Sequence, residues 1–134
     1  MTANKKKIVN KPTVVAQLPQ IIIDTYNLTC TSSDVKMFPG FIKHVKKQHP
    51  GIYETYSSYI KDIVEQPDYV GQNPKEPNSV ELVKILNDHI LIAIKLDPSG
   101  YLFLSTMFDL KNGPAKIQRR LNSGRLVAYK DLLS

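Results

Sequence analysis

The feature that most constrains this chain is a pair of alternating apolar segments joined by a tight turn. Residues 89–96 and 101–108 each alternate between two sets of side chains, and Asp97-Pro98-Ser99-Gly100 between them has the composition of a β-turn. Successive side chains of a strand point to opposite faces, so the pattern predicts an antiparallel hairpin with one face against a core. We therefore expect a fold built around a sheet.

The two faces of this hairpin differ in chemistry. The face expected to pack beneath helices carries Ile90, Ile92, Ile94, Leu96, Leu102, Leu104, Thr106 and Phe108. The other, semi-polar face carries His89, Leu91, Ala93, Lys95, Tyr101, Phe103, Ser105 and Met107. A lysine, a serine and aromatic rings on one surface suit a cleft that grips a phosphate and stacks a base. The alternative is a solvated sheet face, which antiparallel sheets often have.

Helices are predicted mainly ahead of the hairpin. Pro19 is well placed to open a short helix, and further helices are predicted from about Pro39 to Gln48, on a stripe of Phe38, Phe41, Ile42 and Val45, and from about Tyr53 to Glu65. A final helix opens at Asn112-Gly113-Pro114 and is closed by Gly124.

Two further strands complete the predicted sheet. One is expected around Leu28 to Thr31, and the other spans Val80 to Leu86, where a strand is favoured over a short helical segment. Asn87-Asp88 then supplies a hairpin turn. The predicted class is α+β: N-terminal helices packed on a four-stranded antiparallel sheet, with a short C-terminal helix.

Length and composition bound the organisation. A chain of 134 residues fits one domain, which we place at residues 12–134 behind a flexible basic arm at residues 1–11. No apolar run approaches the roughly 18 residues of a membrane span, and no secretory signal is evident. The single cysteine, Cys30, excludes an intrachain disulfide and favours the cytoplasm. It lies in an expected buried strand, which favours packing over a reactive role.

The formal charge of +6 favours polyanions or acidic protein partners. Basic residues of the C-terminal segment include Lys116, Arg119, Arg120 and Arg125. Arg120 flanks the apolar stripe of the last helix, and Arg125 follows its closing glycine. Arginines held at the end of an element can clamp a phosphate through two hydrogen bonds. The alternative is a solvated, charged helix.

His44 is the leading candidate for chemistry. On a helix it lies at the border between the buried stripe and solvent, where an imidazole can be held in place and still reach a ligand. A half-buried packing histidine would occupy the same position. His49 ends a helix, where it would complement the helix dipole, and His89 begins a strand as a surface residue.

Several function classes are excluded by missing patterns. The three histidines and one cysteine have no zinc-ligand spacing, so we expect no metal site. The chain also lacks a phosphate-cradling glycine loop, a Gly-x-Ser-x-Gly elbow and a dinucleotide fingerprint. We therefore expect neither a nucleotide cofactor nor esterase chemistry.

Several segments, taken together, resemble phage-associated nucleases of the barnase–EndoU–colicin–RelE superfamily. Residues 38–44 (Phe-Pro-Gly-Phe-Ile-Lys-His) and His49-Pro50 are similar to the first helix of that family. The other similar segments are residues 67–71 (a helix-to-strand junction), 73–79 (a loop), 91–96 with 101–106 (the core hairpin) and 123–126 (a closing segment). The resemblance spans roughly residues 14–126 and rests on the order and spacing of these segments.

The resemblance implies RNA bound on the open sheet face and cleaved by transfer to the ribose 2′-hydroxyl, without a cofactor. It implies a general acid or base at His44, phosphate stabilisation by Lys95, and orientation by Ser105. Arg120 or Arg125 would hold a non-bridging oxygen. The remaining predicted RNA-binding residues are Lys75, Tyr101, Phe103 and Arg119. No second proton carrier is evident on the open face, and Glu76 is a reserve candidate.

These expectations define three hypotheses. The first is a metal-independent endoribonuclease, a phage or mobile-element effector or toxin with an immunity or antitoxin partner. The second is a non-catalytic RNA-binding module that keeps the fold. The third is a protein-interaction domain. The order of the motifs favours the first, and the incomplete acid–base pair keeps the second open.

Overall fold

A computed structural model of the chain describes residues 11–134. The elements follow in the order β1 (Thr13–Gln17), α2 (Gln20–Thr25), β2 (Asp34–Met37), α3 (Pro39–Gln48), α4 (Ile52–Tyr56), the 3-10 turn η1 (Ser57–Tyr59), α5 (Ile60–Glu65), β3 (Tyr69–Gly71), β4 (Ser79–Ile85), β5 (His89–Leu96), β6 (Leu102–Asp109), α6 (Gly113–Ser123), β7 (Leu126–Ala128) and α7 (Tyr129–Leu133). Residues 1–10 of the predicted basic arm lie outside the described residues. Among the helices of residues 11–134, none is long and apolar enough to cross a membrane.

The sheet has seven strands in the order β1-β2-β6-β5-β4-β3-β7. An antiparallel meander of β3, β4, β5 and β6 forms its centre, and β2 joins β6 in parallel through Val35 and Lys36. The α+β class is confirmed, but the predicted four-stranded sheet is wrong. The strands β1, β3 and β7 were missed because each has only three to five residues, too few for a clear alternation.

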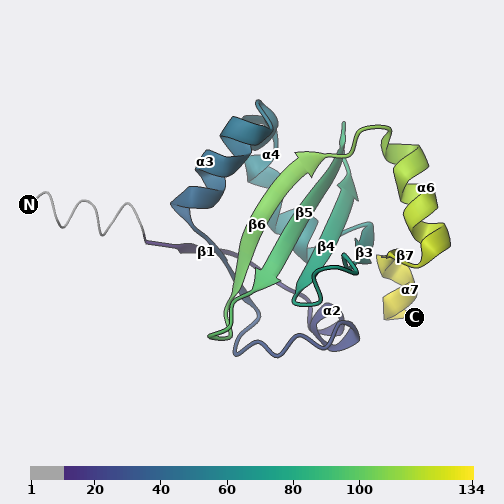
Figure 1. Cartoon of the computed structure of the whole chain (residues 1–134), viewed down its shortest axis with the longest axis horizontal. Coiled ribbons are helices and arrows are strands. Elements are labelled where there is room, and N and C mark those ends of the chain that lie inside the picture. The colour runs from purple at the N-terminus through teal and green to yellow at the C-terminus, as the bar shows by residue number, and fades with distance from the viewer. Residues whose placement is uncertain (1–10) are drawn as a thin grey trace, which may run out of the picture.

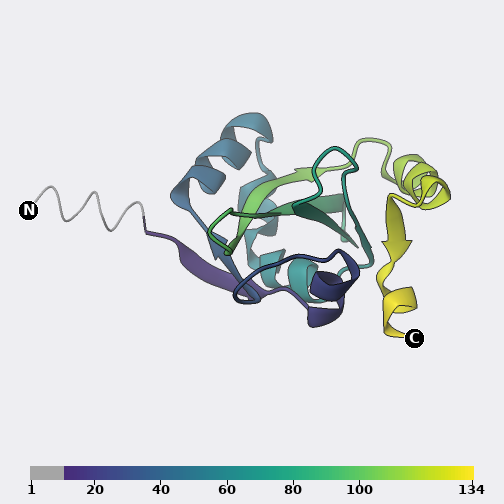
Figure 2. The ribbon, with the colours of Figure 1, turned by 60° about the horizontal axis from the view of Figure 1, so that its bottom comes forward.

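Helices α4 and α5 cover one face of the sheet, and α3 and α6 stand at its two sides (Figures 1 and 2). The main core lies under α4 and α5, where Ile60 and Ile63 pack with Ile90, Ile92 and Ile94 of β5. A smaller apolar cluster on the other face joins α6 to the sheet through Ile117, Leu91 and Val83. Leu91, predicted on the semi-polar face, is therefore buried beneath α6, and the open part of that face is confined to the region beyond α6.

A β-bulge in β6 changes the predicted faces of the hairpin. Ala93 pairs with Thr106 and Ile94 pairs with Leu104, so Ser105 has no partner in β5. An extra residue in one strand inverts the alternation beyond it. Met107 is consequently fully buried in the core, and Thr106 and Phe108 are partly exposed. The prediction that Thr106 and Phe108 face the core, with Met107 opposite, is wrong for this reason.

Two other predicted elements differ from the structure. Residues 28–31 form a loop tied by single backbone hydrogen bonds, one from Thr31 N to Gly100 O (2.9 Å), and the strand begins at Asp34. Cys30 is half-buried in this loop. The predicted helix over residues 53–65 is interrupted by η1, which shifts the helical phase and leaves Tyr59 43% exposed. The first and last predicted helices are confirmed, with Pro19 before α2 and Gly124 at φ 82° after α6.

Candidate active site

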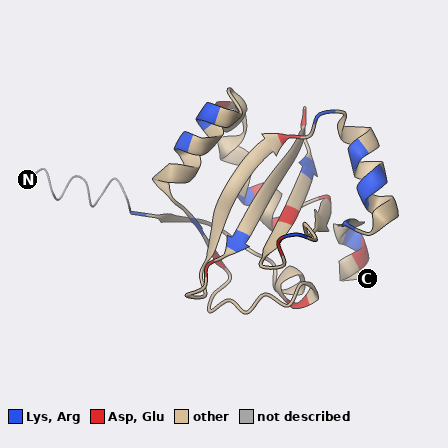
Figure 3. Ribbon diagram, in the orientation of Figure 1, with Lys and Arg blue, Asp and Glu red and all other residues tan. Residues whose placement is uncertain are grey.

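A cleft of about 390 Å³ opens on the face of the sheet opposite the main core, with walls contributed by α3 and α6. Figure 3 shows basic residues on both helices, and basic and acidic residues on the strands between them. The cleft is lined by His44, Asn73, Glu76, Glu81, Leu91, Ala93, Lys95, Ser105, Thr106, Phe108, Arg120 and Arg125. Ala93, at the centre of the sheet, has the smallest side chain in this lining and leaves room above the floor.

His44 reaches the cleft because α3 is anchored by two buried residues. Pro39 opens the helix, and Phe41 and Val45, one turn apart, are 4% and 0% exposed. These anchors turn His44 to the side, toward β6, where its Nε2 lies 3.1 Å from Oγ1 of Thr106. Thr106 is available as a partner because of the bulge at Ser105.

A second histidine stands behind the first. His49, the residue that caps α3, stacks on the ring of Phe108 with 5.3 Å between centroids, and its centroid lies 6.1 Å from that of His44. Burial lowers the pKa of His49 below its ordinary value of 6.5, and the proximity of His44 lowers it further. Two imidazoles therefore stand at the α3 side of the cleft.

Glu81 is the carboxylate that the sequence analysis missed. It lies on β4 opposite Ala93 and is 7% exposed. Arg125 donates two hydrogen bonds of 2.9 Å to its oxygens, one from Nε and one from Nη2. Both oxygens of Glu81 therefore accept from one guanidinium group. The available signal for Glu81 was that it is the one charged residue in the otherwise mostly apolar segment 79–83. The sheet face to which its side chain points depends on how the strands pair.

The guanidinium of Arg120 comes from α6 and completes this cluster. Its Nη1 lies 3.8 Å from Oε1 of Glu81, beyond hydrogen-bonding distance. That nitrogen is buried and has no hydrogen-bond partner among residues 11–134. Burial and the nearby Arg125 lower the pKa of Arg120, and hydrogen bonding to Glu81 raises the pKa of Arg125. Both guanidinium groups remain charged at neutral pH. Arg120, whose side chain is 21% exposed, thus holds one unpaired donor, and that buried nitrogen has to move to meet an incoming oxygen atom.

Lys95 marks the third side of the cleft. Its Nζ lies 3.3 Å from Oε1 of Glu76, and the two side chains are 40% and 46% exposed. An ion pair this exposed contributes at most about 1 kcal/mol. Lys95 can therefore exchange Glu76 for an anionic ligand at little cost.

The chemistry of the lining favours a phosphate ligand. Three basic side chains (Lys95, Arg120 and Arg125) line the cleft with two carboxylates, and His44 adds an imidazole whose ring nitrogens can donate or accept a hydrogen bond. Within the described residues no three His, Cys, Asp or Glu side chains are grouped closely enough to hold a metal ion.

The family described as phage-Barnase-EndoU-ColicinE5/D-RelE like nuclease3 has a sequence model that matches residues 12–118. The chain belongs to this nuclease family. The predicted resemblance is thereby confirmed, although the match ends before Arg120 and the 123–126 segment. Membership indicates a nuclease, and the cleft is its candidate active site. Comparisons with curated proteins and with solved structures found no match.

Five predicted site residues of this nuclease meet in the cleft: His44, Lys95, Ser105, Arg120 and Arg125. Glu76, the reserve candidate, lines it as well. Tyr101 and Phe103 line an adjoining hollow. Lys75 and Arg119 are exposed and lie outside both linings.

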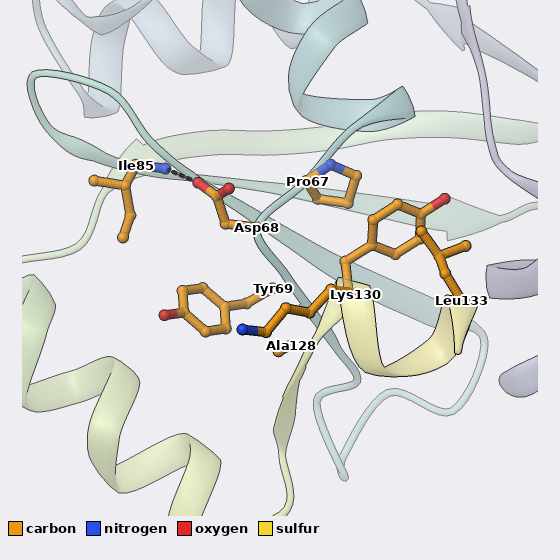
Figure 4. Close-up of a pocket in the computed structure, with 8 residues that line it drawn as sticks. Pro67, Asp68, Tyr69, Ile85, Ala128, Lys130 and Leu133 are labelled. Atoms are coloured by element: carbon orange, nitrogen blue, oxygen red, sulfur yellow. Dashed lines mark hydrogen bonds between the residues drawn. The ribbon is translucent and has the colours of Figure 1, made fainter.

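A second depression, of about 410 Å³, lies away from the cleft between β3, β7 and α7 (Figure 4). Its one carboxylate, Asp68, accepts a hydrogen bond of 2.8 Å from the backbone N–H of Ile85. Lys130 and two tyrosines supply the other ionisable groups of its lining. Asp68 is thus used to hold the end of β4, and we assign this depression no catalytic role.

Proposed function

We propose that this nuclease is a metal-independent endoribonuclease that cleaves RNA by transphosphorylation to the 2′-hydroxyl. The observation that carries the proposal is that an imidazole and a carboxylate line one cleft together with Lys95, Arg120 and Arg125. His44 comes from the α3 side, and Glu81 lies toward α6 beside its two arginines. Cleavage of this kind needs two proton carriers and positive charge at the phosphate.

Glu81 and His44 have complementary roles in this mechanism. The carboxylate of Glu81 takes the proton of the 2′-hydroxyl, because its oxygens keep lone pairs beyond those used by Arg125. The 2′-oxygen then bonds to phosphorus, and the bond from phosphorus to the 5′-oxygen breaks. Protonated His44 gives its proton to that leaving oxygen. The products are a 2′,3′-cyclic phosphate and a 5′-hydroxyl.

The cations and the hydroxyl stabilise the crowded phosphate. Lys95 leaves Glu76 to neutralise one non-bridging oxygen, and the Arg120 side chain, which lines the cleft, turns its unpaired Nη1 toward another. Ser105, which has no partner in β5 at the bulge, orients the group. Donors placed at the developing negative charge typically contribute about 10²- to 10³-fold each to the rate.

Two wider roles belong to the same proposal. Lys75 and Arg119, exposed outside the cleft, steer the RNA backbone by charge. The enzyme acts as a phage or mobile-element effector in the cytoplasm. A toxin of this kind needs an immunity or antitoxin protein, and an acidic surface that covers Lys95 and Arg120 would inhibit it.

Cleavage of RNA in the presence of chelator tests the proposal. The full chain is incubated with EDTA and a circular RNA, a linear RNA or the matching DNA. We expect both RNAs to be cut, with 2′,3′-cyclic phosphate ends, and the DNA to remain intact. A requirement for magnesium, 3′-hydroxyl products or cleavage of DNA would overturn the mechanism. Salt-sensitive RNA binding without product would instead favour the non-catalytic RNA-binding module.

A further inference from the structure

The hollow lined by Tyr101 and Phe103 has a volume of about 410 Å³ and adjoins the candidate active-site cleft on the side of α3. The two cavities share His44, Lys95 and Ser105 in their linings. A molecule with a phosphate in the cleft can therefore extend directly into the hollow.

Three aromatic rings give this hollow its character. Phe38, at the start of α3, lies 5.9 Å from Tyr101 and 6.4 Å from Phe103, between ring centroids, and Tyr101 lies 5.8 Å from Phe103. Phe38 caps α3, Tyr101 immediately precedes β6 and Phe103 lies in β6, and each ring is partly exposed. Phe41 and Leu104 continue the carbon-rich lining. Partly exposed rings next to an anion-binding cleft resemble the stacking surfaces of proteins that bind single strands.

Positive charge lies on both sides of the aromatic rings. Nζ of Lys36 lies 4.6 Å from the centroid of Tyr101, and Lys95 stands at the border with the cleft. A nucleotide base in the hollow would thus have cations near the phosphates on either side of it. Proteins that bind single-stranded nucleic acids combine stacking rings with cations in this way.

We propose that this hollow binds one unpaired nucleobase next to the scissile phosphate, which makes single-stranded RNA the substrate class. The inference rests on the proposed function, since the neighbouring cleft must hold the phosphate. The base stacks on Phe103 and on the face of Tyr101 that Lys36 does not cover. A base inside a duplex has both faces covered by its neighbours and cannot enter.

The hollow selects for an exposed base more than for a particular one. The lining is mostly carbon, and the polar groups Ser105, His44 and Lys95 lie where it meets the cleft. Stacking uses the ring face that every base has, and so tolerates all four. Purines, with a larger face, should bind more tightly than pyrimidines.

The test uses a short oligonucleotide that is 2′-O-methylated except for one ribose, which sets the cleavage site. Versions carry an abasic residue on one side of that site or the other, and a further version is hybridised to its complement. Binding is measured with a fully methylated copy, which cannot be cut, and cleavage with the single-ribose strand. We expect one abasic position and the duplex each to weaken binding by roughly 10-fold or more.

Substitutions of Tyr101 and Phe103 test whether the weaker binding of the abasic strand comes from lost stacking on these rings. Phe103→Leu and Tyr101→Leu keep an apolar side chain but remove the stacking face, and they should weaken binding of the intact strand while leaving the abasic strand unaffected. Tyr59→Leu, at an exposed tyrosine on another surface, should change neither. Equal binding of abasic, duplex and intact strands would overturn the inference. If the strand is cleaved but the abasic versions bind as tightly as the intact strand, the base site alone is refuted. If the abasic versions bind more weakly but no strand is cleaved, the proposed function alone is refuted.

Discussion

The imidazole Nε2 of His44 lies 3.1 Å from the hydroxyl oxygen of Thr106, which joins α3 to the bulged strand β6. Without the bulge, strict alternation would turn Thr106 toward the core and would place Ser105 opposite Ala93 instead. A single irregularity in one strand thus orients the candidate proton carrier.

Thr106→Val tests this relationship. Valine keeps the shape of threonine but removes the oxygen, so we expect the free energy of unfolding to stay within about 1 kcal/mol and kcat to fall by about 10-fold as the ring loses its orientation. The readouts are urea unfolding and RNA cleavage. Thr55→Val, at an exposed threonine of α4, is the control. Unchanged cleavage in Thr106→Val would show that the hydrogen bond does not position His44.

Glu81→Gln should reduce both stability and activity. The substitution leaves Arg125 and Arg120, 26% and 21% exposed, without the carboxylate that balances them. We expect a loss of about 2 kcal/mol, below the value for a fully buried pair, and at least about 100-fold slower cleavage. Glu76→Gln, at the exposed carboxylate beside Lys95, should cost less than about 1 kcal/mol. Equal effects of the two variants on unfolding and cleavage would contradict the roles assigned here.

Gly71 fixes the distance between β3 and β7. A Cβ atom at this position would lie 1.9 Å from the backbone oxygen of Arg125, a contact that only a backbone shift can relieve. Gly71→Ala should therefore destabilise the protein by about 3 kcal/mol and move Arg125 away from Glu81.

Gly40 provides the matched control for that substitution. It lies in the first turn of α3, and a Cβ there would meet nothing within 4 Å. Gly40→Ala should stabilise the protein by about 0.5 kcal/mol. Thermal unfolding of both variants checks this pair, and a Gly71→Ala variant as stable as the parent would show that the strands can separate freely.

His49 should make stability depend on pH below neutrality. Burial, and then the proximity of His44, lower the pKa of His49, so the unfolded chain binds a proton more readily than the folded protein does. The free energy of unfolding therefore falls as pH falls through the ordinary pKa of 6.5 toward the lowered value. When the pH is lowered from about 7.5 to 5.5, the Tm of His49→Gln should fall by less than the Tm of the parent protein. An equal loss in both proteins would assign the pH dependence to other groups.

The sequence predicted best the elements with long periodic patterns and clear end signals. The strand His89–Leu96 has the predicted bounds, and α6 ends at Gly124 as expected. The bulge was missed because strict alternation was assumed through 101–108, and an inserted residue leaves no local mark. Edge strands such as β7 were missed because three residues carry almost no period.

The site was predictable only in part, and for a related reason. His44 could be placed from its own helix, since Phe41 and Val45 define the buried side. Glu81 could not, because its position beside Arg125 depends on strand order and on a contact 44 residues apart. The pairing of distant strands decides which charged residues meet, and the residues of the 79–83 segment do not indicate that Arg125 is the partner of Glu81.

The most direct test of the central claim is single-turnover cleavage of RNA in EDTA by the parent chain, His44→Ala and Gln48→Ala. His44 is exposed, so its replacement should leave the unfolding transition nearly unchanged. We predict that His44→Ala slows cleavage by at least about 100-fold, while Gln48→Ala, on the same helix, cuts at the parental rate. Cleavage by His44→Ala at the parental rate would contradict the account.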